Sequence, residues 1–352
     1  MDSREPIIQN ETSKLEALFR SLNDTKEIDY QNWSTLMNRK IAIIGGAGSI
    51  GSTIVTTLLE ETNSKIFVLD SDESRIHTLI VNLPEILQSK VTGIIADIRD
   101  FQSINNALAE ASPQVVIHTA ALKHVTALEA QPREAYMTNV IGTANVLKSI
   151  ESNNVNDALF ISTDKAANPI SILGKTKLIG EMMWGSSDNL NRTNFSVVRF
   201  GNVFMSRGSV VETFISQIKK NEPITITDFR ATRFFITLQN AAKLIISTVG
   251  SGANQKLIIL KMGTPVRILE LARKLQELYL SSNAIVEIGL KSGEKLHEEL
   301  TTDLERHETV ELEDRYSLHL IHSLSYTEVL AKIPKDNESA KKLISQFISP
   351  KS

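Results

Sequence analysis

The chain has 352 residues, of which 41% are hydrophobic and 22% are charged, the proportions of an ordinary soluble globular protein rather than of a disordered chain. This length exceeds what one hydrophobic core usually serves, so we expect a main domain with a smaller lobe joined to it. The formal net charge of -3 provides no basic surface for nucleic acid or an anionic membrane, and the absence of cysteine excludes disulfides, thiolate metal sites and a cysteine nucleophile.

The first segment, residues 1–39, is a polar extension of mixed charge. It lacks the apolar core of a signal peptide and the roughly twenty apolar residues of a membrane span, so we predict a cytoplasmic protein. An apolar helical spacing within it predicts a short amphipathic helix that packs on the body or on a partner. This spacing joins Leu15, Leu18, Phe19 and Leu22.

From Lys40 to residue 200 the chain alternates short β-branched runs with longer amphipathic segments. That pattern predicts an α/β fold, a Rossmann-like doubly wound parallel sheet with helices on both faces. Helices are expected to begin near Ser49, Ser74, Phe101, Arg133 and Leu173. Strands are expected at Ile41–Ile44, Ile66–Asp70, Thr92–Ala96, Val115–His118, Leu159–Ser162 and Ser196–Arg199.

After Arg199 the regular alternation ends. We therefore assign residues 201–352 mainly to a smaller C-terminal substrate-binding lobe, with some segments returning to the main domain. The pieces assigned to this lobe include Ile224–Thr227, Ile258–Lys261, Ile268–Leu280 and Ala284–Ile288.

A glycine-rich turn, GGAGSIG, directly follows the first predicted strand and opens a helix. Gly45 allows the tight turn, Gly48 lets the backbone approach a pyrophosphate, and Gly51 permits close packing of helix on strand. The N–H groups at the start of the helix, near Ser49 and Ile50, can face an anion. A phosphoryl-transfer loop is disfavoured because no lysine stands before its Ser or Thr. The turn predicts a dinucleotide site.

An acidic residue, Asp70, ends the second strand about twenty residues after the last glycine. A carboxylate there accepts from the adenosine ribose and disfavours a 2′-phosphate, so we favour NAD over NADP. Asp70 can also simply start a turn. Further cofactor contacts are predicted at two later strand ends, at Asp97 and Ile98 and at Ala120, although Asp97 can equally be a turn residue.

From the fifth strand onward, the sequence motifs point to one particular family. In order, the segments GGAGSIG, HTAALKHV, TNVIGTANV, STDKAANP, VRFGNVFMSRGSV, ATRFFIT and KSGEKLHEEL resemble the polysaccharide-biosynthesis branch of the extended short-chain dehydrogenases. The resemblance runs from about Lys40 to about Leu300. It implies a nucleotide-sugar 4,6-dehydratase, a lyase typically acting on UDP-N-acetylglucosamine, that uses NAD catalytically and regenerates it.

By this resemblance, Asp164 protonates the departing C6 hydroxyl and Lys165 removes the C5 proton. Thr163 would hydrogen-bond the C4 oxygen. Lys177 would hold the nicotinamide ribose and keep the site positive, which is expected to lower the pKa of Lys165 towards that of a working base. The alternative for Asp164 and Lys165 is an exposed ion pair in a loop.

The chain departs from the general pattern at Leu173, where short-chain dehydrogenases place a tyrosine four residues before Lys177. Leucine takes no proton, so Asp164, Thr163 through water, or Lys177 remains as base for C4 oxidation. A degenerate, inactive NAD-binding protein is the competing explanation. Asn139 is expected either to support the catalytic lysine or to pack its helix.

Substrate contacts are predicted after the fourth strand and in the smaller lobe, where polar donors suit a diphosphate and Glu294 suits a ribose. Lys291 replaces the arginine usual in the family and loses its planar fork. For each of these residues, solvated surface is the alternative. The candidates are Lys123, His124, Asn202, Ser206, Arg207, Ser209, Arg233, Lys291 and Glu294.

Other functions stay open. A nucleotide-sugar 4- or 5-epimerase fits the same scaffold, a non-catalytic NAD-binding protein fits Leu173, and a methyltransferase shares the glycine turn. Beyond the nucleotide-sugar substrate we predict no nucleic acid, no membrane span and no metal. The helices around Asn139 and after Leu173 are expected to pair across a two-fold axis, giving a homo-oligomer, a dimer or a larger even assembly.

Overall fold

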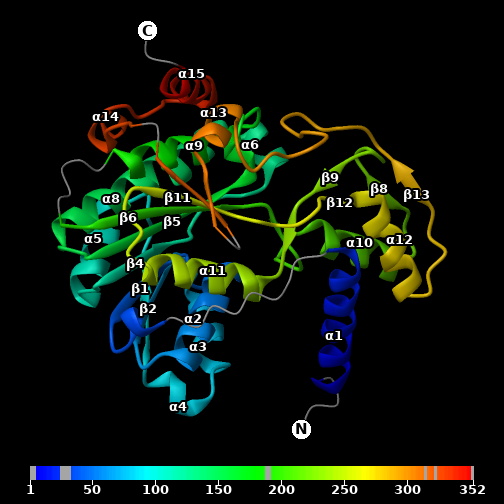
Figure 1. Cartoon of the computed structure of the whole chain (residues 1–352), viewed down its shortest axis with the longest axis horizontal. Helices are drawn as coiled ribbons and strands as arrows, with labels where there is room; N and C mark the ends of the chain where they lie inside the picture. The colour runs from blue at the N-terminus through cyan, green and yellow to red at the C-terminus, as the bar shows by residue number, and fades with distance from the viewer. Residues whose placement is uncertain (1–4, 24–32, 187–191, 313–314, 321–322, 350–352) are drawn as a thin grey trace.

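The centre of the molecule is a nine-stranded sheet covered by helices on both faces (Figure 1). Seven strands run parallel, and the last two join antiparallel at one edge. The predicted doubly wound α/β fold is thereby confirmed. The computed structural model describes residues 5–23, 33–186, 192–312, 315–320 and 323–349. In spatial order the strands are β14 (Val310–Glu311), β15 (Arg315–His319), β11 (Lys256–Leu260), β6 (Asn194–Phe200), β5 (Asp157–Thr163), β4 (Val115–His118), β1 (Lys40–Ile44), β2 (Lys65–Asp70) and β3 (Val91–Ile95).

The central strands are apolar on both faces because both faces are covered. In β1, Ala42 and Ile44 face one helical layer, whereas Ile41 and Ile43 face the other, and all four are buried. Two separate hydrophobic layers result. One is covered by α5 (Phe101–Ala111), α8 (Gly142–Ser152) and α9 (Ile172–Gly185), the other by α2 (Ser49–Glu61), α3 (Glu73–Val81) and α11 (Leu238–Gly250).

All six predicted strands of the first half are present, within two residues of the expected ends. One prediction is wrong: Ile258–Lys261, which we assigned to the substrate lobe, overlaps β11, and β11 pairs in parallel with β6 in the central sheet. Three or four apolar residues predict a strand but not the strand's neighbour. The remaining short elements around this sheet are η1 (Ser34–Leu36), α4 (Glu85–Gln88), α6 (Val125–Ala130), α7 (Pro132–Ala135), the π-helix η2 (Tyr136–Ile141) and the 3-10 turn η3 (Asp164–Ala166).

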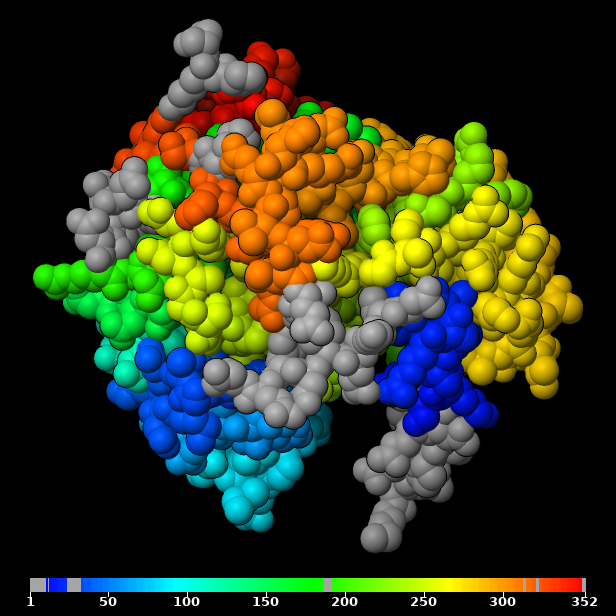
Figure 2. All heavy atoms as spheres, viewed as in Figure 1, coloured from blue at the N-terminus to red at the C-terminus, as the bar shows by residue number. Residues whose placement is uncertain are grey.

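A third hydrophobic cluster forms the smaller lobe to one side of the sheet (Figure 1). The helix predicted near the N-terminus is α1 (Glu5–Leu22), which lies against the smaller lobe (Figure 2). Its Leu15, Leu18 and Phe19 are buried in the cluster of this lobe. The domain boundary at residue 200 stays a prediction. The lobe and its connection to the sheet contain β7 (Asn202–Val203), α10 (Val210–Lys219), β8 (Ile224–Ile226), β9 (Thr232–Arg233), β10 (Phe235–Ile236), β12 (Val266–Arg267), α12 (Ile268–Leu278) and β13 (Ile285–Glu287).

The C-terminal part of the chain returns to the main domain through α13 (Asp303–Glu308), α14 (Tyr326–Leu330) and α15 (Asn337–Ile348). There α15 packs on α7 and α9, and α14 packs on α8. These are the helices on which we predicted two copies to pair, so the chain's own C-terminus occupies part of that face. The homo-oligomer stays a prediction. Within the described ranges, no helix has the length and apolar character needed to cross a bilayer.

Candidate active site

The glycine turn connects β1 to α2, and three of its glycines, Gly45, Gly46 and Gly51, have no room for a side chain. Gly45 has a φ of +78°, and a Cβ there would lie 2.6 Å from the backbone nitrogen of Ala120. A Cβ at Gly51 would lie 2.3 Å from the carbonyl oxygen of Gly45. At Gly48 the nearest such contact, to the carbonyl oxygen of Gly45, is 3.3 Å, so the internal constraint is weaker there than at the other three glycines. The turn is built for close approach of a ligand to the backbone at Gly48.

The start of α2 is suited to an anion. Its N-cap, Gly48, supplies no side-chain cap, and its first turn carries no acidic residue. The first N–H groups of a helix lack internal partners, so Ser49 and Ile50 stand where a pyrophosphate is favoured. Asp70 ends β2 beside this turn and accepts hydrogen bonds from the backbone N–H groups of Ala47 and Asp72, both at 3.1 Å. Asp70 therefore acts as a turn residue and also holds the glycine loop.

The other residues predicted to contact the cofactor are placed as follows. Asp97 is bound bidentately by Arg99, and the guanidinium lowers the pKa of this carboxyl. Ile98 is buried beneath α8, where a Cβ on Gly142 would lie 2.6 Å from it. Ala120 donates its N–H to Ile44 at 3.0 Å and lies against the glycine turn. The structure thus brings Ala120 to the turn and gives Asp97 and Ile98 structural partners of their own.

The end of β5 carries a tightly coupled acid and amine. Asp164 accepts hydrogen bonds at Oδ1 from the Thr163 hydroxyl at 2.9 Å and from the Lys165 ammonium at 3.0 Å. The Asp164 side chain is fully buried and that of Lys165 is 17% exposed, so the loop ion-pair alternative, which required exposure, is wrong. Oδ2 of Asp164 has no hydrogen-bond partner among the described residues. It lies where Gly201 leaves room, since a Cβ there would be 3.2 Å from it.

The protonation of Lys165 differs from our prediction. Burial alone would lower its pKa, but the negative charges of Asp164 and Glu298 outweigh burial and raise the pKa above the ordinary lysine value. Arg233 acts in the opposite direction and is a smaller influence. The expectation that a positive site lowers the pKa of Lys165 is therefore wrong for this state, because two carboxylates and not cations dominate its surroundings.

Lys177 has the character that we predicted for Lys165. It lies on α9, is 6% exposed, and its Nζ is 3.9 Å from the centre of the Phe160 ring. Burial lowers its pKa to about 7, with Glu181 one turn further along α9 opposing the shift. The neighbouring His118 is fully buried, and burial together with the charge of Lys177 lowers its pKa to about 3. Lys177 can thus exist as a neutral amine at ordinary pH.

The two remaining residues of this region are buried. Leu173, in the first turn of α9, is 5% exposed and packs in the core layer. Asn139 lies in the π-helix η2, whose irregular geometry is frequent at functional sites. Its side chain bonds both backbone groups of Leu122, at 2.9 and 3.0 Å, and donates to Thr176, next to Lys177, at 3.2 Å. Asn139 therefore connects the loop after β4 to the helix of Lys177.

A second loop crosses the start of α2. The backbone N–H of Arg207 donates to the Ser49 hydroxyl at 3.2 Å, and Lys123 donates to the Arg207 carbonyl at 2.7 Å. Burial lowers the pKa of Lys123. Ser206 is buried and Ser209 caps α10, while a Cβ on Gly208 would lie 2.6 Å from the His124 ring. The structure brings these predicted substrate residues together at the glycine turn. Their roles in binding stay predictions.

The other lobe residues have partners within the chain, and their roles in substrate binding stay predictions. Asn202 accepts a hydrogen bond at Oδ1 from the Lys165 ammonium at 3.1 Å, so it lies beside the acid and amine at the end of β5. Arg233 donates to the carbonyls of Thr232, Lys295 and Leu296 at 2.7 to 3.0 Å, and these bonds occupy the fork that we assigned to a diphosphate. Lys291 and Glu294 bond to each other within one turn.

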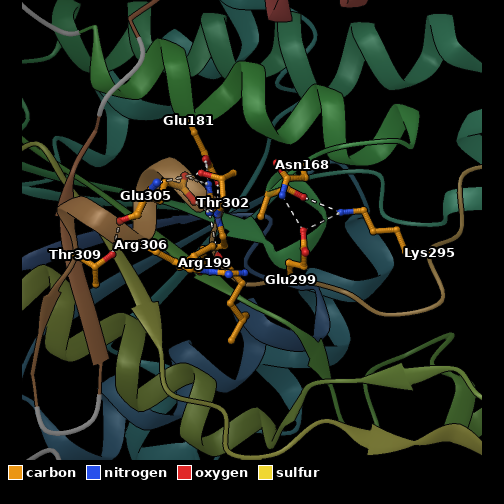
Figure 3. A network of polar contacts seen from close by, with 12 residues as sticks. Asn168, Glu181, Arg199, Lys295, Glu299, Thr302, Glu305, Arg306 and Thr309 are labelled. Carbon is orange, nitrogen blue, oxygen red and sulfur yellow. Dashed lines mark hydrogen bonds and ion pairs between the residues drawn. The ribbon is translucent and has the colours of Figure 1, made fainter.

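Two buried groups escaped the sequence reasoning. Glu298 lies 3.6 Å from Lys165 Nζ, and its side chain is 4% exposed. Arg199 in β6 is fully buried between Glu181 and Glu305, with contacts of 2.6 to 3.1 Å, and also donates to the Leu300 carbonyl at 3.0 Å (Figure 3). A glutamate in a charged stretch gives no local signal of burial. The signal for Glu298 was its place in KSGEKLHEEL, one of the segments that carry the family resemblance.

The sheet order, the glycine turn and the strand-end cluster define the class of the protein as a Rossmann-like short-chain dehydrogenase fold. The chain belongs to the polysaccharide biosynthesis protein family, whose model matches residues 41–320. It is 36% identical over 278 residues to the capsular polysaccharide biosynthesis protein CapD of Staphylococcus aureus, covering 77% of this chain and 46% of CapD. The chain thus spans about half the length of that relative.

Two further similarities cover at least four fifths of each protein compared. A UDP-N-acetylglucosamine 4,6-dehydratase (inverting) of Campylobacter jejuni is 35% identical over 291 residues, covering 80% of this chain and 84% of the relative. The X-ray structure of Pen from Bacillus thuringiensis matches with a TM-score of 0.76 and 32% identity, covering 84% of this chain and 98% of Pen. Relatives of similar identity are named UDP-glucose 4-epimerase.

Proposed function

We propose that this chain is a lyase that removes water from a nucleotide-linked N-acetylhexosamine, with UDP-N-acetylglucosamine as the preferred substrate, for the synthesis of a surface polysaccharide. The observation that carries the proposal is the buried acid and the partly buried amine at the end of β5, where Asp164 and Lys165 meet at 3.0 Å. Membership of the polysaccharide biosynthesis family and the name of the Campylobacter relative support it.

The residues around the glycine turn fit NAD. Gly48 leaves the backbone open at an uncapped helix start, and Asp70 presents a carboxylate beside it. We assign Gly45, Gly48, Ser49, Ile50 and Gly51 to the pyrophosphate, Asp70 to the adenosine ribose and Lys177 to the nicotinamide ribose. NAD, when bound, accepts hydride from C4 of the sugar and returns it to C6.

Elimination needs an acid at the C6 hydroxyl and a base at the C5 hydrogen. Asp164 and Lys165 already share the proton required, because the ion pair and its neutral form differ only in the position of one proton across their contact. Moving that proton from Nζ to the carboxylate yields a carboxylic acid and a free amine. Exclusion of water by a bound sugar favours this neutral form, since desolvation penalises charge.

The proton balance then closes. Lys165 takes the C5 proton, the electrons of that C–H bond form the C5–C6 double bond, and the C6–O bond breaks. The hydroxyl leaves with the proton of Asp164 as water, so the elimination ends with the ion pair from which it began. When hydride is returned to C6, the Lys165 ammonium gives a proton to C5, and the proton released by the C4 hydroxyl restores the ammonium. Because the carboxylate and the amine are buried and fixed by Thr163 and Asn202, little reorganisation is needed at the moment of reaction.

The proton of the C4 hydroxyl needs a separate acceptor, because Leu173 has no group that titrates. Of the three residues left open by the sequence, Lys177 is assigned this role, since its pKa of about 7 makes a neutral amine available. Asn139, bonded beside it to Thr176, holds the start of α9 against the loop after β4.

Incubation of the purified protein with UDP-N-acetylglucosamine, with and without added NAD, tests the proposal. A 4-keto product lighter by one water is expected, without net consumption of NAD. An unchanged mass with inverted stereochemistry would instead select the epimerase, the function named in several relatives. Recovery of unaltered substrate in both conditions would reject this substrate.

A further inference from the structure

We propose that Glu298 is the positioning residue of the catalytic amine: its carboxylate holds Lys165 in place and stabilises the positive charge that Lys165 gains when it takes the C5 proton. This inference rests on the proposed function, because it gives Glu298 a part in that same elimination. It adds a group from the segment after β13 to a site otherwise built at the end of β5.

The first argument is geometric. The Glu298 side chain is 4% exposed, and its Oε1 lies 3.6 Å from Lys165 Nζ. Its other oxygen, Oε2, is buried and has no hydrogen-bond partner within the described part of the chain. A buried carboxylate with an unsatisfied oxygen is costly, so its presence beside a buried amine calls for a reason beyond packing.

The second argument is that the chain holds Glu298 in place from both sides. Before it, Arg233 donates to the carbonyls of Lys295 and Leu296. After it, the buried Arg199 donates to the carbonyl of Leu300. Both arginines therefore donate side-chain hydrogen bonds to the backbone of this short segment. A carboxylate fixed in this way acts on a neighbouring charge without first having to be oriented.

The third argument concerns charge during the reaction. The charged and polar groups that face Lys165 are Asp164, Asn202, Glu298 and the more distant Arg233. Asp164 gives up its negative charge when it becomes the acid, and it regains that charge only as the hydroxyl leaves. Glu298 is the carboxylate next to Lys165 that takes no part in the proton transfers of the elimination, so it supports the ammonium as it forms.

Glu298→Gln removes this charge with almost no change in shape. We expect kcat to fall about a hundredfold with KM little changed, the lower end of the range for loss of one preorganised electrostatic contact. The alkaline limb of the rate profile should move to lower pH. The alkaline limb marks the loss of the Lys165 ammonium proton, without which Asp164 has no proton to give to the hydroxyl. Removing the charge of Glu298 lowers the pKa of Lys165, so this loss occurs at lower pH. Glu298→Asp should restore part of both effects.

Glu299→Gln is the matched control, because Glu299 is the next residue, is 43% exposed and bonds to Asn168 and not to Lys165. It should leave kcat and the alkaline limb unchanged. If Glu298→Gln leaves the limb at the wild-type pH, with or without a loss of turnover, the positioning role is overturned. If that variant does not fold, the limb of Glu298→Asp decides: it should lie below that of the wild type, and an unmoved limb would refute the role.

A direct titration separates this inference from the proposed function. With 13C-labelled lysine, the Cε signal of Lys165, assigned by its loss in Lys165→Met, reports the protonation of Nζ without substrate. We expect the signal to titrate at lower pH in Glu298→Gln than in the wild type. A wild type inactive on the sugar nucleotide would reject the dehydratase, yet this shift would still be seen. An unshifted titration would reject the role of Glu298 even if the enzyme dehydrates its substrate.

Discussion

The end of β5 and the inner face of α9 each bury a lysine, and the two environments have opposite effects on it. Lys165 lies between Asp164 and Glu298, whose charges outweigh burial and raise its pKa. Lys177 lies over the Phe160 ring, and burial there lowers its pKa to about 7. The two amines belong to one predicted site, but they start from different protonation states.

The difference shows that burial alone does not decide the state of a cation. Arg199 is the extreme example, because it is fully buried and its charge is balanced by two glutamates. Where carboxylates converge on the cation, the charge is kept and a proton can be passed within the cluster. Where an aromatic ring replaces them, the neutral form is favoured and the amine can act as a base directly.

The largest expected effect follows from removing the carboxylate-flanked amine. Lys165→Met deletes the proposed base for the C5 hydrogen, so turnover should fall about a thousandfold, within the range usual for general bases. NAD should still copurify, since the glycine turn is untouched, and this is checked by absorbance and mass spectrometry. A variant that retains turnover within a factor of about ten would contradict the assignment.

Arg199→Met tests the same principle away from the reaction. It leaves Glu181 and Glu305 buried without their cation, so the free energy of unfolding should fall by about 3 to 5 kcal/mol. Chemical denaturation measures the change. Adding Glu181→Gln and Glu305→Gln to the variant should recover much of the loss, and no recovery would show that shape rather than charge dominates this cluster.

A smaller effect is expected at the aromatic-flanked amine. Wild-type turnover should rise as the pH passes upward through about 7, because Lys177 must be neutral to take the C4 hydroxyl proton. Lys177→Arg stays charged, so turnover should fall about a hundredfold and this acid limb should disappear. Lys175→Arg, two residues earlier on α9, is the control. Persistence of the limb in Lys177→Arg would assign it to another group.

A last effect concerns the pH dependence of stability. The folded-state pKa of Lys177 is about 7 and its ordinary value is 10.5, so between these values the unfolded chain binds more protons than the folded one. The free energy of unfolding contributed by this residue should therefore rise with pH across that window and stay level outside it. Denaturation of the wild type and of Lys177→Met at several pH values gives the difference in slope. Equal slopes would contradict the lowered pKa.

The comparison also separates what local sequence predicts from what it does not. The strands, the glycine turn and Asp70 follow from patterns a few residues long, and the structure places them as expected. Asp164 and Lys165 are neighbours in the chain, so their meeting was local as well.

The predictions that failed concern contacts between segments far apart in the chain. Glu298 contacts Lys165, and Arg233 holds the backbone of the segment that carries Glu298. Both lie far along the chain from β5, as does β11, which joins the sheet beside β6. The pKa of Lys165 is raised first by its sequence neighbour Asp164 and then by Glu298, and the contribution of Glu298 had no local signal. No spacing rule predicts such convergence, which is set by packing of the complete fold.

The most direct test of the central claim is incubation of the protein with UDP-N-acetylglucosamine in deuterated water, read by mass spectrometry and NMR. The account predicts a 4-keto product lighter by one water and carrying solvent deuterium at C5, and neither change with Lys165→Met. A product of unchanged mass, or dehydration that survives in Lys165→Met, would contradict it.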